Sequence, residues 1–377
     1  MKIGSTKSTE NEPYRIKKNA VTCRRVQKGA DMNTGISLYF STGIRKNERI
    51  ITKAAACGVK YAFTSLHIPE ETGADYRGDI RHMLKLCREN GMNLIVDVGP
   101  ETLELLGVKR IDELQPMGIT HIRLDYGFSA ADTVRLAKSF HVVFNASTIT
   151  ESDIGAWREA GADFSRFTAC HNFYPKPLTG LSLQRIREIN QRLRFLGFTI
   201  LGFVPGNKEL RGPLKEGLPT AESHRNQKEE VLLNMLELYY DGLCDVVLVG
   251  DVDVTEKAWQ DIACLSRDYV ELKADILPEF DFVRDTIHHD RPDSGELVIR
   301  SQESRQCKQH ISPLGTRKRP AGSISLSNEK YLRYMGELEI ARVDLPAEER
   351  VTVIGQVDPA YVKYLPFIRQ GLGVKLV

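Results

Sequence analysis

The stretch Asp79–Val98, DIRHMLKLCRENGMNLIVDV, contains the unit from which the fold can be predicted. Its first part, up to Asn90, has the apolar spacing of a helix with one buried face, and Gly91 is well suited to end that helix. The next residues, Asn93–Val98, form a short apolar run of the kind found in buried strands. The stretch therefore predicts a helix, a glycine and a strand in immediate succession.

The same succession recurs along the chain, with further glycines between helical segments and strands at positions 58, 118, 161 and 197. Eight strand–helix units predict a (β/α)8 TIM barrel. A doubly wound open sheet is the alternative, but it usually has fewer strands, and no G-x-G-x-x-G sequence follows the first strand. The predicted strands are Ile36–Phe40, Tyr61–Leu66, Asn93–Val98, His121–Asp125, Val142–Asn145, Phe164–Ala169, Thr199–Val204 and Val246–Gly250.

The chain divides into three predicted parts. Residues 1–33 are rich in Lys, Arg and Asn without periodicity, so we expect a disordered leader, and translation could start at Met1 or at Met32. Residues 34–268 form the catalytic barrel. In residues 269–377 the pattern changes to short alternating runs such as GSISLSN and RVTVIGQV, which predict a small β domain.

Composition excludes several classes of function. The chain has 52 Lys and Arg against 50 Asp and Glu, so a general nucleic-acid binder is not expected. Its seven cysteines have neither C-x-x-C nor zinc-ligand spacing, which indicates reduced thiols in a cytosolic protein. No apolar run approaches the about 18 residues of a membrane span, and no export signal is present. We expect a cytoplasmic protein without a membrane segment or cofactor.

Carboxylates at the strand ends are the candidate catalytic groups, because the loops after the strands build the active site of a TIM barrel. Asp97 and Asp125 end neighbouring predicted strands, and Glu70 follows the second strand. A buried unpaired carboxylate is costly, so packing alone does not explain them. Two carboxylates on one rim are what glycoside hydrolysis requires. Strand alternation turns the adjacent Glu71 away.

Other polar residues at the same rim are predicted to bind the ligand. Those expected to contact a sugar are His67, Asn145, His171, Asn172 and Tyr174. Barrels often bind phosphate at the loops after strands seven and eight, where this chain has Arg211 among glycines. Arg317, in the basic loop of the second domain, is expected to close on the same anion. The alternative for the Arg211 loop is a lid with solvated charges.

Metal chemistry and Schiff-base chemistry are two alternatives for a barrel rim of this kind. His67, Asp97, Asp125 and His171 are residue types that ligate Zn²⁺ or Mn²⁺, but no H-x-H or H-E-x-x-H spacing supports a metal site, and none is predicted. A Schiff-base lysine is disfavoured because the nearest lysines lie in loops beyond the strands. A metal-dependent sugar-phosphate isomerase or epimerase and a non-catalytic sugar-phosphate-binding protein remain alternatives.

Taken together, several motifs resemble the 6-phospho-N-acetylmuramidase family, from about Gly35 to the C-terminus. They are GISLYFS, FTSLHIPEE, RLDYG, NAST, ACHNFYPKPLTGLS, RGPLKEGLPTAESHR and RPAGSISLSNEKYLRYMGELEI. The resemblance implies a TIM barrel followed by a cyclophilin-like β domain. It also implies cleavage, in the bacterial cytoplasm, of a phosphorylated amino-sugar disaccharide, N-acetylmuramic acid 6-phosphate linked β-1,4 to N-acetylglucosamine, during peptidoglycan recycling.

The resemblance does not assign the acid or the nucleophile to a residue of this chain. In substrate-assisted glycosidases the 2-acetamido oxygen of the sugar replaces a protein nucleophile. Both mechanisms are open for Asp97, Asp125 and Glu70, and the sequence leaves the oligomeric state undetermined.

Overall fold

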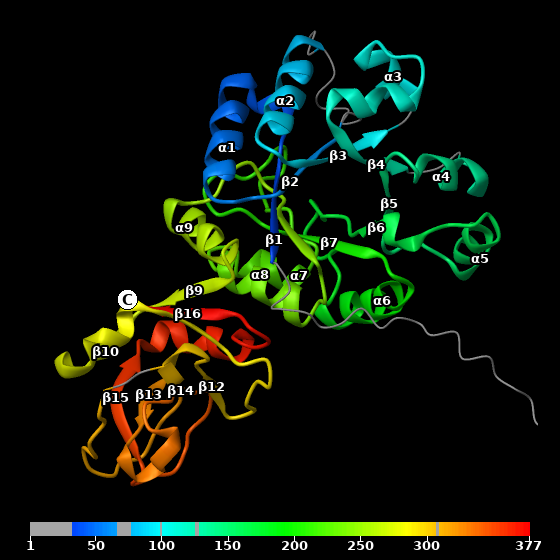
Figure 1. The fold of residues 1–377 in the computed structure, drawn as a ribbon. Coiled ribbons are helices and arrows are strands. Elements are labelled where there is room, and N and C mark those ends of the chain that lie inside the picture. Colours follow the sequence, from blue (N-terminus) through cyan, green and yellow to red (C-terminus); the bar gives the residue numbers. More distant parts are fainter. Residues whose placement is uncertain (1–31, 66–76, 99, 125–127, 307–308) are drawn as a thin grey trace, which may run out of the picture.

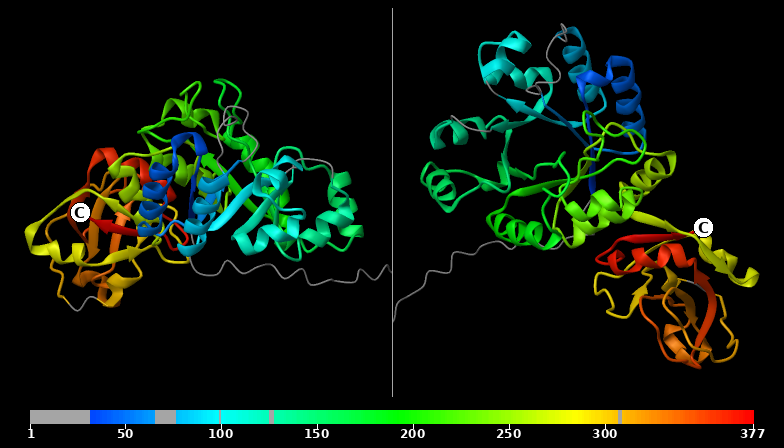
Figure 2. Two further views of the ribbon diagram at one scale, coloured as in Figure 1. Left: turned by 90° about the horizontal axis from the view of Figure 1, so that it is seen from above. Right: turned by 180° about the vertical axis from the view of Figure 1, so that it is seen from behind.

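The computed structural model describes residues 32–65, 77–98, 100–124, 128–306 and 309–377. Three of the predicted site residues, His67, Glu70 and Asp125, lie outside the described residues, as does the predicted leader up to residue 31. The last residue of that predicted leader, Asn33, begins the first strand. The described chain forms a barrel followed by a smaller β part, which lie side by side (Figures 1 and 2).

The barrel confirms the predicted fold class. Its eight parallel strands are paired in sequence order, and β1 closes the ring by pairing with β8. The strands are β1 Asn33–Ser37, β2 Tyr61–Thr64, β3 Asn93–Val98, β4 Ile119–Leu124, β5 His141–Asn145, β6 Phe167–Cys170, β7 Thr199–Val204 and β8 Val246–Val249.

The helices of the barrel lie outside the ring of strands (Figure 1). They are α1 Ile44–Ala56, α2 Arg77–Glu89, α3 Pro100–Leu106, α4 Ala130–Leu136, α5 Glu151–Glu159, α6 Leu183–Leu196, α7 Glu222–Asn226, α8 Val231–Tyr240 and α9 Glu256–Leu265.

The first and sixth strands each start three residues from the predicted position, and the fourth starts at Ile119 and not at His121. The first strand occupies Asn33–Ser37, and a 3-10 turn follows at Phe40–Thr42. The sixth strand starts at Phe167, because the side chain of Asp163 accepts a hydrogen bond from the Ser165 backbone and begins a 3-10 turn at Phe164–Arg166. Aspartate commonly competes with a strand in this way, by bonding the backbone two residues on.

Side chains that cap helices account for some of the polar residues that follow strands. The Ser129 hydroxyl accepts the Asp132 backbone N–H at the start of α4. At α5, Thr150 and Asp153 form a capping box, each side chain bonding the backbone of the other. Ser129 and Asp153 therefore have structural roles.

The inside of the barrel is a separate apolar cluster, distinct from the larger core between strands and helices. Because strand side chains alternate, residues two positions beyond a member of this cluster point toward the same axis. The cluster contains Phe63, Ile95, Val143, Cys170, Leu201, Phe203, Val246 and Leu248.

The second part is mostly β, as the alternating pattern predicted, and its strands form two sheets. The larger has the order β10-β15-β13-β14-β12, and in the smaller β16 lies between β11 and β9. The strands are β9 Tyr269–Leu272, β10 Ala274–Ile276, β11 Ile287–His289, β12 Val298–Arg300, β13 Ser323–Ser327, β14 Leu338–Ala341, β15 Val351–Val357 and β16 Gly373–Leu376.

This part adjoins α8 of the barrel. A 3-10 helix at Pro359–Phe367 packs on α8. Lys363 Nζ of this 3-10 helix lies 2.6 Å from Oε1 of Glu230, which stands at the start of α8. At the other end of α8, the Arg369 guanidinium lies over the Tyr240 ring. No helix among the described residues is both long and apolar enough to span a membrane.

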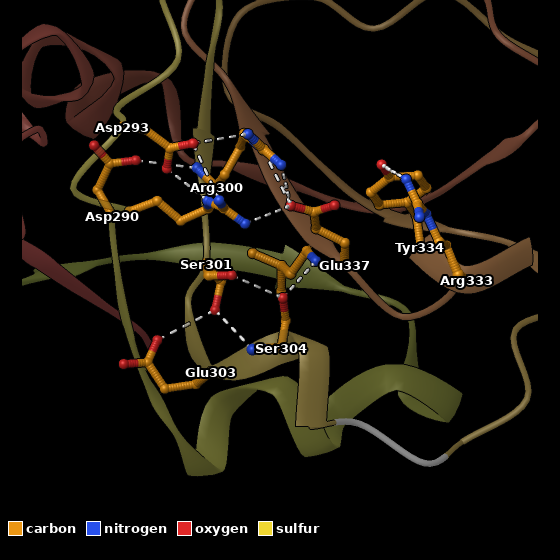
Figure 3. Close-up of polar contacts among 11 residues, drawn as sticks. Asp290, Asp293, Arg300, Ser301, Glu303, Ser304, Arg333, Tyr334 and Glu337 are labelled. Carbon is orange, nitrogen blue, oxygen red and sulfur yellow. Dashed lines mark hydrogen bonds and ion pairs between the residues drawn. The ribbon is translucent and has the colours of Figure 1, made fainter. Parts of the chain in front are cut away.

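Buried charges in the second part are compensated within it (Figure 3). Arg300 donates from Nε and Nη2 to Glu337 Oε1, at 3.0 and 2.7 Å. Asp290, fully buried, accepts the Arg300 backbone N–H and lies 3.6 Å from Arg342 Nη2. Because buried charges need partners of opposite charge, the role of this cluster is to stabilise the fold of the second part.

Candidate active site

Three polar side chains meet at the carboxyl ends of β3, β4 and β6. Asp97 lies two residues beyond Ile95 of the interior cluster and pairs in register with Arg123. Arg123 Nε lies 3.7 Å from Asp97 Oδ1, and Arg123 Nη2 donates to Asn172 Oδ1 at 2.5 Å. The arrangement joins a carboxylate, a guanidinium and an amide from three strands, and Asp97 and Asn172 are two of the predicted site residues.

The Cys170 thiol, at the end of β6, is not poised as a nucleophile. Cys170 is fully buried in the barrel interior and donates to the His171 carbonyl oxygen. Burial raises the pKa of the Cys170 thiol to about 12, although Arg123 acts in the opposite direction. The thiol therefore stays protonated near neutral pH.

Asn145 ends β5 and helps to shape the following turn. Its Oδ1 accepts the Ser147 backbone N–H at 3.0 Å. It lines a cavity of about 390 Å³ together with Phe128 and Trp157, beside α4 and α5. Asn145 thus stands at the border between the rim and this cavity.

His171 does not join the Asp97 group. It is fully buried, and its Nε2 lies 2.7 Å from Asn190 Oδ1 of α6. Burial lowers the pKa of His171 to about 4, so the ring is neutral near pH 7. Its ring contacts a helix outside the barrel, so it points away from the barrel interior, which the neighbouring Cys170 faces. The position of His171 is that of a core residue between β6 and α6.

The loops after β6 and β7 are tied together. Tyr174 donates its backbone N–H to the Pro219 carbonyl, and its own carbonyl accepts from Arg225 Nη2 at 2.6 Å. Arg225 also donates to the Gly217 carbonyl and pairs with Glu222. The Arg225 hydrogen bond is the main reason that the pKa of Glu222 is lowered to about 2. Neither Glu222 nor Arg225 was chosen as a site residue from the sequence.

Arg211 is held at the mouth of the barrel beside β1 and β8. Its guanidinium lies 4.0 Å from the centroid of the Tyr39 ring, a cation–π arrangement. Its backbone N–H donates to Asp251 Oδ1 at 2.8 Å. Asp251 is not among the predicted site residues, although it directly follows the predicted eighth strand in GDVDVT, because strand alternation gives Asp251 and Asp253 the same orientation.

Burial raises the pKa of Asp251, while the backbone N–H groups of Arg211, Gly206 and Leu218 act in the opposite direction. Asp253 holds the Trp259 indole N–H at 2.9 Å and the Lys208 ammonium at 2.7 Å. Asp253 therefore has a structural role, and Asp251 is the carboxylate that bonds the backbone of Arg211 itself.

Arg317 belongs to the surface of the second part. Its Nη2 donates to the Val353 carbonyl at 2.5 Å. It lines a cavity of about 420 Å³ whose walls come from residues between Asp275 and Gln356. Across the ranges that the structure describes, no group of three or more His, Cys, Asp or Glu side chains could hold a metal ion.

Comparisons with known proteins cover both parts of the chain. Residues 34–264 match a family model described as 6-phospho-N-acetylmuramidase, N-terminal, and residues 269–377 match the corresponding C-terminal model. A solved structure of a conserved Enterococcus faecalis protein with an unknown function has 32% identity and a TM-score of 0.68, covering 92% of this chain and 96% of that one. A structure of an uncharacterized B. cereus protein has 24% identity and a TM-score of 0.68, covering 92% and 99%, and shows the same fold. A search of curated proteins gave no match.

Proposed function

This chain belongs to the 6-phospho-N-acetylmuramidase family, and from that premise we propose how the mouth of its barrel cleaves the β-1,4 bond of the phosphorylated disaccharide. The family is one of glycosidases that act on sugars containing N-acetylmuramic acid 6-phosphate. The observation that carries the proposal is Arg123, which joins Asp97 to Asn172 at the carboxyl ends of the strands.

Asp97 acts in its charged form. A guanidinium within 4 Å favours the carboxylate over the carboxylic acid, and Arg123 Nε lies 3.7 Å from Asp97 Oδ1. A carboxylate suits the nucleophile, or the group that orients the 2-acetamido oxygen, but not the proton donor. The general acid is then Asp125 or Glu70, which lie outside the described residues.

The amides bind the sugar. Asn172 is oriented by Arg123, so its amide nitrogen can donate to a sugar hydroxyl or acetamido oxygen while its oxygen is occupied. Asn145, at the end of β5, and Tyr174, in the loop after β6, are the further sugar ligands of this proposal, together with His67, which lies outside the described residues. His171 packs between β6 and α6 and is not a ligand in this proposal.

Arg211 binds the 6-phosphate. It stands at the strand-seven and strand-eight loops, where TIM barrels commonly bind phosphate, and its planar fork suits two phosphate oxygens. Arg317 is left out, because its guanidinium bonds the Val353 carbonyl within the second part. A substrate phosphorylated during uptake would be cut in the cytoplasm, which is where we propose that the protein acts.

The experiment compares the phosphorylated disaccharide with its unphosphorylated form. Release of N-acetylglucosamine by the purified protein is followed chromatographically, with and without a chelator. We expect cleavage of the phosphorylated sugar, unaffected by the chelator. Absence of cleavage of either sugar would overturn the proposal, and loss of activity with the chelator would favour a metal-dependent reaction.

A further inference from the structure

Asp251 is a buried carboxylate that receives three backbone N–H groups from one loop. Its side chain follows β8, and the residue is 1% exposed. Its Oδ2 accepts from Gly206 at 2.9 Å and from Leu218 at 3.0 Å, and its Oδ1 accepts from Arg211 at 2.8 Å. Burying a carboxylate is unfavourable unless hydrogen bonds replace its water, so this geometry is built specifically for the loop.

The loop lies between β7 and α7, and its residues 205–221 form neither helix nor strand. Gly206, Arg211 and Leu218 stand at its beginning, middle and end, so one carboxylate fixes it at three points. A Cβ atom at Gly206 would lie 2.8 Å from the Asp251 Cβ. The close approach that brings the Gly206 N–H to Asp251 therefore requires glycine.

The Arg211 side chain is held from the same strand end as its backbone. Its guanidinium lies 4.0 Å from the Tyr39 ring centroid, and Tyr39 is 1% exposed. The Tyr39 hydroxyl donates to the carbonyl of Gly250, the residue before Asp251. Residues 250 and 251 thus fix both the backbone of Arg211 and the ring beneath its guanidinium.

We infer that Asp251 and Tyr39 are positioning residues, which hold the Arg211 guanidinium in place for the phosphate group before the sugar binds. The inference rests on the proposed role of Arg211. Asp251 is too buried to touch the substrate, so it acts through Arg211. An arginine that is already placed loses less conformational freedom on binding, and the gain is in affinity for the phosphorylated sugar.

Asp251→Asn tests this selectively. Asparagine has one acceptor oxygen, which can keep the Gly206 and Leu218 N–H groups, but its NH₂ then faces the Arg211 N–H, donor against donor. The variant loses the hydrogen bond between the Arg211 N–H and the charged Asp251 carboxylate. We therefore expect KM for the phosphorylated disaccharide to rise about tenfold. We expect kcat to change less than about twofold, because the interaction is equal in the ground and transition states. Kinetics with the unphosphorylated sugar should not change.

The matched control is Asp253→Asn, which alters a carboxylate two residues away that bonds the Lys208 side chain of the same loop and the Trp259 indole, and not the Arg211 backbone. It should keep the wild-type preference for phosphate. Tyr39→Leu removes the ring and should weaken the preference, whereas Tyr39→Phe keeps it and should have the smaller effect. If Asp251→Asn does not fold, as judged by circular dichroism, the two Tyr39 variants carry the test.

A double-mutant cycle separates this inference from the proposed function. If Asp251 acts through Arg211, adding Asp251→Asn to Arg211→Ala causes no further loss of phosphate preference. Unchanged preference in Arg211→Ala alone would overturn the proposed phosphate site. Two outcomes would overturn only the positioning role, provided that Arg211→Ala itself loses phosphate preference. In the first, Asp251→Asn and Tyr39→Leu both keep the wild-type preference. In the second, the losses of preference in the double variant are additive.

Discussion

Arg123 Nε lies 3.7 Å from Asp97 Oδ1, and the two side chains are only 11% and 14% exposed. They come from neighbouring strands and are partners in the β3–β4 register. The guanidinium also bonds Asn172, two residues beyond β6, so residues from the ends of three strands contribute to one polar group. The polar group therefore depends on both the Asp97 carboxylate and the Arg123 guanidinium.

Asp97→Asn should lower kcat for the phosphorylated disaccharide by about 100-fold or more, the usual range when a positioned carboxylate is lost. The amide keeps the size of the side chain but cannot act as a base or nucleophile. Asp153→Asn, in the exposed capping box of α5, is the control and should retain turnover. Near-native turnover in Asp97→Asn would make this carboxylate a structural one.

Arg123→Lys should lower kcat by about tenfold, because a single ammonium cannot reproduce the fork that contacts both Asp97 and Asn172. The positive charge is retained, so the variant tests geometry. Initial rates at saturating substrate measure the effect. Wild-type kcat would mean that charge alone is required at this position.

Arg225→Ala should destabilise the protein by about 3 kcal/mol, because it leaves Glu222 without its buried ion-pair partner. The Gly217 and Tyr174 carbonyls lose their hydrogen-bond donor as well, so proteases should cleave the loops after β6 and β7 faster. Chemical denaturation and limited proteolysis measure the two effects. The exposed Arg185→Ala is the control, and equal stability in the two variants would contradict the prediction.

Stability should fall on acidification because of a histidine pair at the start of the barrel strands. The His121 and His141 rings stack at 4.6 Å, and Arg166 Nη1 lies 3.3 Å from His141 Nε2. Burial, with smaller effects of His141 and Arg166, lowers the pKa of His121 to about 3. The unfolded chain therefore binds more protons than the native state between about pH 6.5 and 3, and stability is lost as the pH falls through that range.

At pH 5 the expected loss from His121 is about 2 kcal/mol relative to neutral pH. Denaturant titrations at pH 7.5 and pH 5 measure it. His121→Phe keeps a ring beside Tyr61 and His141 and should reduce the pH dependence, whereas His82→Asn, on the exposed face of α2, should not. An unchanged pH dependence in His121→Phe would show that other groups dominate.

The barrel and the β part were predictable because their signals are local. Apolar spacing, glycines after helices and strand alternation each act within about a dozen residues. The errors in strand position had local causes as well, such as the Asp163 side chain that turns Phe164–Arg166 away from β6. Asp97 and Asn172 could be placed at the rim because parallel strands all end on one face.

What the sequence by itself determined is therefore the set of elements and the polar residues at their ends. Only the tertiary structure decided how those residues are used: it directs the His171 ring toward Asn190 of α6, joins Asp97 to Asn172 through Arg123, and turns Asp251 toward three amides of a distant loop. These outcomes depend on contacts between residues far apart in the chain. No local pattern records such contacts, because they form only when the strands close into a ring.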